Sequence, residues 1–178
     1  MLKSRILVIP AILALAACGQ SGDAPKEQAA AEATTAAAPA PVATVSPEEG
    51  AKIAEARHEG FEAIGKSMKA IGDQLKAGSP DVETIKTNAA KIAEAAPKVK
   101  DWFPAGSGPE VAPKSEALPA IWEKPADFAA ALDKFVAEAG KFNTTAQAGD
   151  VAAIGAGMKA LGGTCKGCHD NFKKEDES

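Results

Sequence analysis

Apolar or small residues recur at spacings of three and four in four separate segments between residues 53 and 172. This period places them along one side of an α-helix, so each segment predicts an amphipathic helix that buries a single stripe. The four stripes are Ile53, Arg57, Phe61, Ile64, Met68, Ile71 and Leu75; Val82, Ile85, Ala89, Ile92, Ala96, Val99 and Phe103; Phe128, Leu132, Phe135, Ala139 and Phe142; and Val151, Ile154, Met158, Leu161, Cys165, Cys168 and Phe172.

Capping and breaking residues indicate where these helices begin and end. Ser46 or a neighbour is expected to cap the first helix, and Gly78 follows its end. Ser79 is expected to cap the second helix, with a proline at its first position. Pro97 should bend that helix, because proline cannot donate the backbone hydrogen bond of a helix interior. Asp150 is the expected cap of the last helix.

The connections between these helices predict an all-α fold, an antiparallel four-helix bundle. Short connections at residues 77–79 and 145–149 make the helices on either side antiparallel neighbours. The middle connection, residues 104–124, is long and rich in glycine and proline, so we expect it to wrap one end of the bundle. The bundle domain is predicted to span residues 46–178.

The pentapeptide Cys165-Lys166-Gly167-Cys168-His169 carries the chemistry of the last helix. A Cys-x-x-Cys-His sequence is the attachment signature of c-type haem, in which both cysteines form thioethers with the porphyrin and the histidine binds the iron. Both cysteines fall on the apolar stripe, so one covalently attached haem c is expected inside the bundle, near the C-terminal helix. His169 is the predicted metal ligand.

Two other interpretations of the motif have less support. A zinc site needs four ligands, and the other candidates are Cys18 and His58, which lies about a hundred residues away. A redox dithiol is expected beside a βαβ pattern, and the chain has no convincing strand run.

Residues 1–17 have the composition of an export signal. Lys3 and Arg5 precede an apolar run at residues 6–17, which is too short to span a bilayer once cleaved. The run ends in Leu15-Ala16-Ala17-Cys18, which resembles the lipobox of bacterial lipoproteins. The resemblance implies cleavage before Cys18 and lipid modification of that cysteine; an ordinary signal peptide is the alternative. Because glycine rather than aspartate follows Cys18, we expect anchoring to the outer membrane, on the periplasmic side of the cell envelope.

Residues 18–45 consist largely of alanine, proline, threonine, glutamate and glutamine. Such a composition buries too little apolar surface to offset the entropy of ordering, so this segment is predicted to be a disordered tether. Loss of Lys3 and Arg5 with residues 1–17 takes the net charge from −4 to about −6. Nucleic acid is therefore excluded as a partner, because phosphate contacts need a basic patch. The lipid is the expected contact with the membrane.

A haem motif on the last helix of a four-helix bundle resembles the class II c-type cytochromes, and cytochrome c′ in particular. The resemblance covers residues 46–175. Besides the haem motif, it rests on three stretches and one pair of residues: Trp102-Phe103-Pro104-Ala105-Gly106-Ser107-Gly108, Leu118-Pro119-Ala120-Ile121-Trp122, His169-Asp170-Asn171-Phe172-Lys173, and Arg57 with Phe61.

The resemblance implies a role for each residue of the site. His169 would be the sole protein ligand of the iron, with Lys173 close to it on the solvent side. Arg57 would lie near the haem edge or its propionates. Phe61 would stand over the open iron face, where low-spin relatives place a ligating methionine, so the sixth coordination position should be empty.

Each of these roles has a simpler alternative. Phe61 could be an ordinary core residue, Arg57 could extend its charge into solvent at the helix end, and Lys173 could be a solvated residue. His58 is the rival iron ligand, because it lies about 60° around the helix from Phe61.

The resulting expectation is a five-coordinate, high-spin haem protein that binds nitric oxide and carbon monoxide in an apolar pocket. Electron transfer with an unidentified redox partner is a second expected role. The alternatives are a six-coordinate, low-spin electron carrier that uses His58 or a methionine, and a lipoprotein whose haem motif is accidental. No acid, base or nucleophile set converges near the pocket, so no enzymatic activity is predicted. A homodimer rests on the resemblance alone.

Overall fold

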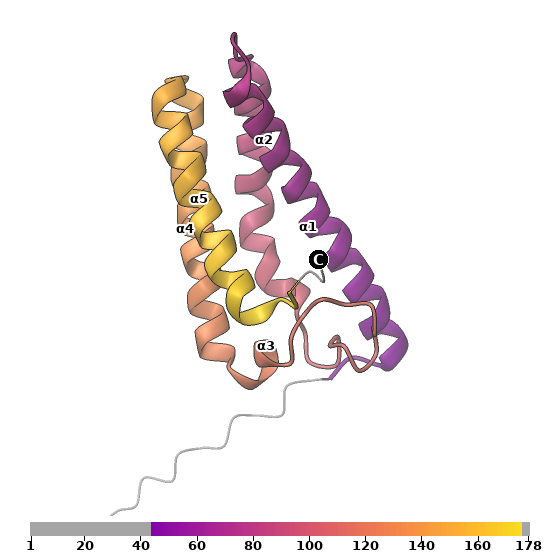
Figure 1. Ribbon diagram of the computed structural model, residues 1–178. Helices are drawn as coiled ribbons and strands as arrows, with labels where there is room; N and C mark the ends of the chain where they lie inside the picture. The colour runs from indigo at the N-terminus through magenta and orange to yellow at the C-terminus, as the bar shows by residue number, and fades with distance from the viewer. Residues whose placement is uncertain (1–43, 176–178) are drawn as a thin grey trace, which may run out of the picture. The chain divides into compact units, whose positions relative to one another are not determined.

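The computed structural model describes residues 44–175. The predicted signal peptide, Cys18 and almost all of the predicted tether lie outside the described residues. The described elements are, in chain order, α1 (Pro47–Lys76), α2 (Val82–Ala95), the 3₁₀ helix η1 (Ala96–Trp102), α3 (Ala120–Glu123), α4 (Pro125–Ala148) and α5 (Val151–Phe172) (Figure 1). None of the described helices combines the length and the apolar character that crossing a bilayer requires.

Side-chain caps fix the starts of α1 and α5. The Ser46 hydroxyl accepts a hydrogen bond from the backbone N–H of Glu49 at 3.3 Å. The Asp150 carboxylate accepts hydrogen bonds from the backbone N–H groups of Ala152 and Ala153, at 2.9 and 3.1 Å. Each cap satisfies donors that the first turn of a helix leaves without an intrahelical partner. Both predicted caps are confirmed.

The second helix begins later and ends earlier than predicted. Its N-cap is Asp81, not Ser79. The Asp81 carboxylate accepts hydrogen bonds from the backbone N–H groups of Glu83 (3.0 Å) and Thr84 (3.3 Å) and from the Thr84 hydroxyl (2.7 Å). At the other end, α2 gives way to the 3₁₀ helix η1 at the residue before Pro97. Proline lacks the N–H that the next α-helical hydrogen bond needs, so it ends the helix rather than only bending it.

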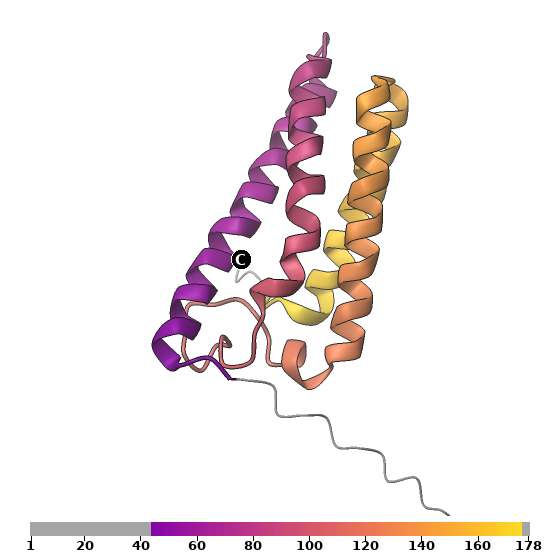
Figure 2. The same cartoon turned by 180° about the vertical axis from the view of Figure 1, so that it is seen from behind.

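The four long helices form an antiparallel bundle, which confirms the predicted all-α fold. α1 packs on α2, α2 on α4 and α4 on α5 through extensive interfaces, whereas α1 and α5 touch at few positions. Figure 1 and Figure 2 show α1 leaning away from α5 toward the end of the bundle where α5 ends. The α1–α5 side is therefore the least tightly closed side of the bundle.

The core is formed by the predicted stripes. Its most deeply buried apolar side chains come from all four long helices: Ile71, Ile85, Ala89, Ile92, Ala139, Phe142, Ile154 and Leu161. Burial of each large side chain contributes about 1.5–3 kcal/mol, so this set supplies much of the stability of the fold. Two stripe members depart from the prediction: Val151 is 36% exposed because it is the first residue of α5, and Phe61 is 37% exposed.

Residues 103–119, which we call the strap, cross the end of the bundle between α1 and α5, as expected of the middle connection (Figure 1). The strap also binds the segment that leads into α1, because the Val45 N–H donates to the Ala105 carbonyl at 3.0 Å. Gly106 has a φ of +86°, and a Cβ atom there would lie 2.7 Å from the Thr44 methyl group, so glycine is required. The residues before α1 are thus fixed to the strap.

Candidate haem site

The two cysteines of the motif lie on the side of α5 that packs against the core, and both are half-buried. Burial raises the pKa of the Cys165 and Cys168 thiols above the ordinary value, and the proximity of Cys165 raises the pKa of Cys168 further. Both groups are therefore protonated at neutral pH and pack as small apolar side chains until they react. His169 follows on the exposed side of the same turn.

The described residues give no support to a zinc site or a redox dithiol. Within residues 44–175, no group of three or more histidine, cysteine, aspartate or glutamate side chains is arranged to hold a metal ion. Over the same range, extended pairing is confined to one isolated bridge between Ala117 and Lys173, so the βαβ setting of a redox dithiol is absent there. The haem interpretation of the motif is the one that the fold favours.

A row of aromatic rings joins α1 to the motif end of α5. The ring of Phe61 meets Trp102 at 5.2 Å and Phe103 at 6.1 Å between centroids. Phe103 meets Phe128 at 4.8 Å, and Phe128 meets Phe172 at 5.2 Å. Phe172 lies four residues after the second cysteine of the motif, and therefore on the same face of α5. The thiols thus share their face with one end of an aromatic wall.

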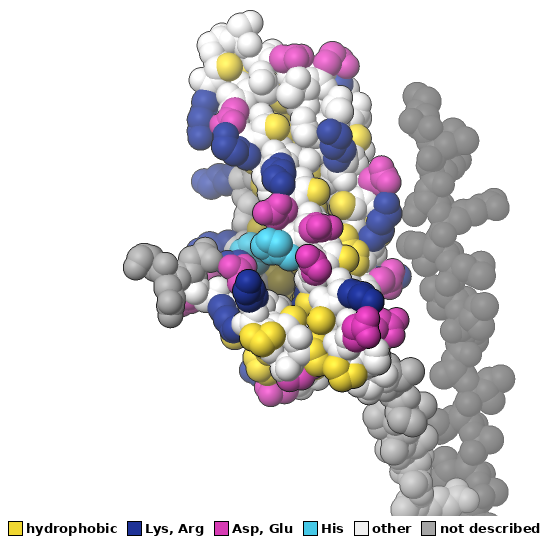
Figure 3. Space-filling view, turned by 90° about the vertical axis from the view of Figure 1, so that its right-hand side faces the viewer, with side chains coloured by type: hydrophobic (Ala, Val, Ile, Leu, Met, Phe, Trp, Pro, Cys, Tyr) yellow, Lys and Arg dark blue, Asp and Glu magenta, His cyan; other side chains and the backbone are white. Residues whose placement is uncertain are grey.

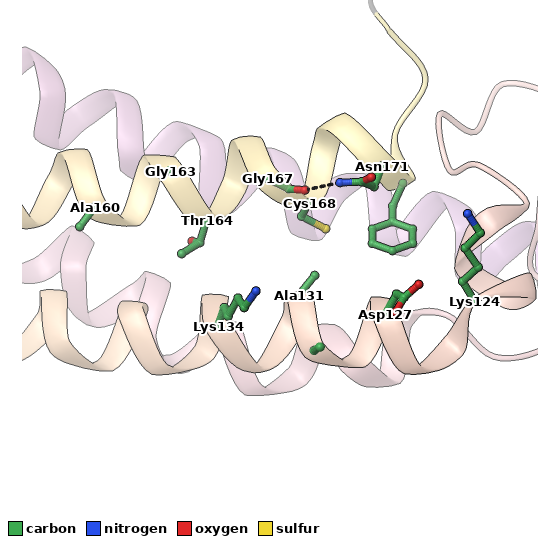
Figure 4. Close-up of a pocket in the computed structure, with 12 residues that line it drawn as sticks. Lys124, Asp127, Ala131, Lys134, Ala160, Gly163, Thr164, Gly167, Cys168 and Asn171 are labelled. Carbon is green, nitrogen blue, oxygen red and sulfur yellow. Dashed lines mark hydrogen bonds between the residues drawn. The ribbon is translucent and has the colours of Figure 1, made fainter.

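The surface around the motif is hollowed on two sides. Figure 3, which shows the α1 side of the molecule, has hydrophobic side chains exposed in and below a hollow, with histidine at its margin. Figure 4 shows Cys168 beside a groove of about 570 Å³ between α4 and α5. Small residues of both helices line this groove together with charged and polar side chains: Ala130, Ala131, Ala160, Gly163 and Gly167 with Lys124, Asp127, Lys134, Thr164 and Asn171. Half-buried thiols, an adjacent imidazole and the aromatic row beside them are what a covalently attached haem requires, so the residues present fit it.

Arg57 is only 4% exposed although it is charged. Its Nη1 atom donates to the Trp102 carbonyl (3.0 Å) and the Ser107 hydroxyl (3.2 Å). Its Nη2 atom donates to the Ser107 carbonyl (3.0 Å) and the Ser115 hydroxyl (3.2 Å). Burial lowers the pKa of Arg57, and the negative charge of Glu110 partly opposes this effect. The guanidinium is thus held inside the protein by neutral oxygen atoms.

Two interpretations of Arg57 were a contact with a haem propionate and a charge that extends into solvent. The guanidinium does not extend into solvent at the helix end, so that alternative is wrong. All four η N–H groups donate within the protein, which leaves the Nε–H for a haem propionate. The propionate contact stays a prediction.

Phe61 is too exposed, at 37%, to be an ordinary core residue. Its ring meets Trp102 edge-on, with an angle of 89° between the ring planes. Gly60 makes this contact possible, because a Cβ atom there would lie 2.6 Å from the Trp102 ring. The phenyl ring is therefore supported on one side by the indole and exposed on another, and its position over the iron stays a prediction.

His58 and Lys173 occupy different settings. The His58 side chain is 68% exposed, and its Nε2 atom lies 3.7 Å from Glu62 Oε1, which favours a surface role over iron ligation. The Lys173 side chain is 26% exposed, and its Nζ atom lies 3.3 Å from Glu116 Oε2. Lys173 therefore contacts the strap and is more than a solvated tail residue.

The partners of Arg57 in the strap could not be found from the sequence. Ser107 is completely buried and, besides accepting from Arg57, donates its hydroxyl to the Pro104 carbonyl at 2.8 Å. Ser107 and Ser115 lie in an irregular segment, which has no period to indicate their orientation. The signal in the sequence was Arg57 itself, a charged residue on an apolar stripe. A buried charge needs hydrogen-bond partners, so this pattern indicates that such partners exist somewhere in the fold.

A half-buried Cys-x-x-Cys-His motif at the end of the last helix of a four-helix bundle defines a c-type haem protein of the bundle class. The family described as Cytochrome C′ matches residues 52–173. The chain belongs to this family and therefore carries one covalently attached haem c.

Both sequence and structure relate the chain to known proteins. The cytochrome c′ of Pararhodospirillum photometricum is 38% identical over 114 residues, which cover 61% of this chain and 91% of the relative. The solved structure of cytochrome c prime from Shewanella frigidimarina is 29% identical, with a TM-score of 0.64 over 75% of this chain and 100% of that chain. A nitric oxide complex of a cytochrome c prime variant from Alcaligenes xylosoxidans has the same fold, with a TM-score of 0.63 and 24% identity over 75% of this chain and 100% of that chain.

Proposed function

We propose that this protein is a five-coordinate, high-spin haem protein that binds nitric oxide and carbon monoxide, with His169 as the sole protein ligand of the iron. The observation that carries the proposal is the setting of Phe61. This side chain is partly exposed, is held by Trp102 and Phe103, and has no atom that could bind iron or a hydrogen-bonding ligand. It stands at the position that the family resemblance places over the open iron face.

Each residue has its own task in this proposal. Cys165 and Cys168 attach the edge of the ring to α5 and so fix its orientation. The imidazole of His169 would bind the iron. When bound, the haem supplies an iron atom with one open coordination position. Phe61 limits the space at that position and offers no hydrogen bond, so neutral diatomic molecules are favoured over polar or anionic ligands.

Two observations support gas binding rather than a second protein ligand. The His58 side chain is 68% exposed and its Nε2 atom lies 3.7 Å from Glu62 Oε1, which favours a surface role for this imidazole. The Alcaligenes xylosoxidans protein, which has the same fold, was solved as a nitric oxide complex. We also propose that ligands are bound without being transformed, because the site consists of an apolar wall, two attachment cysteines and one iron ligand.

The cellular setting is part of the proposal. We propose that the chain is exported, cleaved before Cys18 and anchored by lipid on that cysteine to the periplasmic side of the outer membrane. The support is the apolar run at residues 6–17 followed by Leu15-Ala16-Ala17-Cys18. Electron transfer with an unidentified redox partner and homodimer formation stay predictions.

Absorption and electron paramagnetic resonance spectra of the ferric holoprotein test the coordination state. We expect high-spin iron, and we expect the ferrous protein to bind carbon monoxide without first losing a protein ligand. A low-spin ferric spectrum with a second histidine or a methionine on the iron would overturn the proposal in favour of an electron carrier. Haem that remains on the denatured chain in a gel stain would check the attachment itself.

A further inference from the structure

The strap contacts both sides of the haem site, although α1 and α5 themselves touch at few positions. On the α1 side it is held by Arg57, and on the α5 side it pairs with the residues that follow His169. We propose that Arg57 is a positioning residue, which acts through the strap to set the separation between Phe61 and the His169 end of α5. This inference rests on the proposed function, because two of its readouts are measured at the haem.

The hold of Arg57 on the strap involves both ends of that segment. At the start of the strap, the central carbon of the guanidinium lies 4.6 Å from the centre of the Phe103 ring, and the group also donates to the carbonyl of Trp102, the last residue of η1. Further along, it donates to Ser107 and to the Ser115 hydroxyl. A planar, fork-shaped group is needed for this set, because the donors of a lysine converge on one nitrogen. One turn of α1 is thus fixed to two distant parts of the strap.

From Ser115 the strap runs directly to the last turn of α5. The Ser115 hydroxyl, which accepts from Arg57, also accepts from the Ala117 N–H at 3.2 Å. Ala117 pairs with Lys173 in an isolated antiparallel bridge. The Leu118 N–H donates to the Phe172 carbonyl at 3.0 Å. A side chain of α1 therefore shares a hydrogen-bond partner with the strand-like segment that holds the end of α5.

Three more contacts connect this path to the iron ligand. The Lys173 N–H donates to the His169 carbonyl at 3.1 Å, and the Lys174 N–H donates to the Glu116 carbonyl at 2.7 Å. The Lys173 ammonium group lies 3.3 Å from the Glu116 carboxylate. The backbone of His169 is therefore one hydrogen bond from a residue that pairs with the strap.

The same guanidinium also supports the opposite wall of the site. Trp102, whose carbonyl accepts from Arg57, presents its ring to Phe61. Loss of Arg57 should therefore loosen Phe61 and the His169 end together. A residue that only held a propionate would act differently, because its loss would leave amide exchange in residues 115–118 and 172–174 unchanged.

The test compares Ser115→Ala, Arg57→Gln and the double variant with the wild-type holoprotein. Ser79→Ala is the matched control, because Ser79 is exposed and lies at the opposite end of the bundle. Three quantities are measured: the rate of carbon monoxide binding to the ferrous protein, the iron–histidine stretching frequency by resonance Raman spectroscopy, and amide hydrogen exchange in residues 115–118 and 172–174.

Ser115→Ala should speed carbon monoxide binding about threefold or more, shift the stretching frequency and accelerate exchange in both segments. Arg57→Gln should act in the same direction, and the double variant should add little to it, because the two residues lie on one path. Wild-type values of all three quantities in a folded Ser115→Ala protein would overturn the inference, even if Arg57→Gln does not fold. A low-spin ferric wild-type protein would instead refute the proposed function, and the exchange measurement would still decide on the strap.

Discussion

Trp102 supports Phe61 edge-on, with 5.2 Å between the ring centroids, and its backbone carbonyl accepts a hydrogen bond from Arg57. One residue of η1 thus contacts two side chains that lie a single turn apart on α1. This arrangement leaves Phe61 little freedom toward the core while its outer side stays open. Phe61 is therefore the most direct place to test how ligands reach the iron.

Phe61→Ala should speed carbon monoxide binding to the ferrous protein at least about tenfold, equivalent to roughly 1.4 kcal/mol of barrier. The cost in stability should be about 1–2 kcal/mol, below the value for a fully buried phenylalanine, because the ring is partly exposed. Stopped-flow mixing measures the rate, and Val151→Ala, which also trims a partly exposed apolar side chain, is the control. An unchanged rate in a folded variant would remove Phe61 from the distal site and return His58 to consideration.

Phe61→Met tests the same position from the opposite direction. A thioether at this site can bind the open iron position, so the ferric protein should change from high-spin to low-spin. Absorption and electron paramagnetic resonance spectra report the change. A variant that keeps the wild-type high-spin spectrum would mean that residue 61 does not reach the iron.

His169→Ala should leave the haem attached by its thioethers but without its proximal ligand, whereas Cys165→Ala and Cys168→Ala should each impair attachment. A haem stain of the denatured chain and the ferric spectrum separate these outcomes. His58→Ala is the matched control and should keep the wild-type spectrum, since His58 is exposed and paired with Glu62. Identical spectra for His169→Ala and the wild type would show that the ligand assignment is wrong.

Cys18→Ala should move the protein from the membrane fraction to the soluble fraction of the envelope, because the proposed lipid would have no attachment point. Fractionation followed by a haem stain measures the distribution. A variant that stays with the membrane would argue for another anchor, and a wild-type chain found only in the soluble fraction would argue for an ordinary signal peptide.

Asp81→Ala should lower the Tm at neutral pH, whereas Ser79→Ala should change it little, because Asp81 is the residue that caps α2. Hydrogen bonds from Thr84 lower the pKa of the Asp81 carboxyl in the folded protein. The carboxylate therefore contributes its full stabilisation above its unfolded pKa, about 4, and loses it as the pH falls through the lower folded value. Thermal unfolding across a pH series should show the Asp81→Ala difference shrinking in acid. A larger loss of Tm for Ser79→Ala than for Asp81→Ala would instead support Ser79 as the N-cap of the second helix.

The sequence was sufficient for the helices and the haem motif because both depend on local spacing. Ile71, Ile154 and Leu161 lie where the period of three and four places them, in the core. The start of α2 was misplaced because Ser79 and Asp81 are both good capping residues, and only the backbone geometry selects between them. Spacing could therefore predict the stripes more reliably than the ends of helices.

The contacts of Arg57 and Lys173 could not be predicted, for a different reason. Ser107 and Ser115, which contact Arg57, and Glu116, which contacts Lys173, all lie in the irregular strap. Each of them is remote in sequence from the residue that it contacts. Side-chain direction in such a segment is set by the folded path of the chain and has no periodic signal. The helical positions of the site residues could thus be predicted from spacing, whereas the contacts of Arg57 and Lys173 with the strap could not.

The thin contact between α1 and α5 has a consequence for the order of assembly. The interfaces of α1 with α2, α2 with α4 and α4 with α5 are made by protein side chains and involve helices close in sequence, so they can form early in folding. The α1–α5 side has few such contacts, so we expect it to close last as the bundle folds, and α1 to be the long helix that most easily moves away from α5.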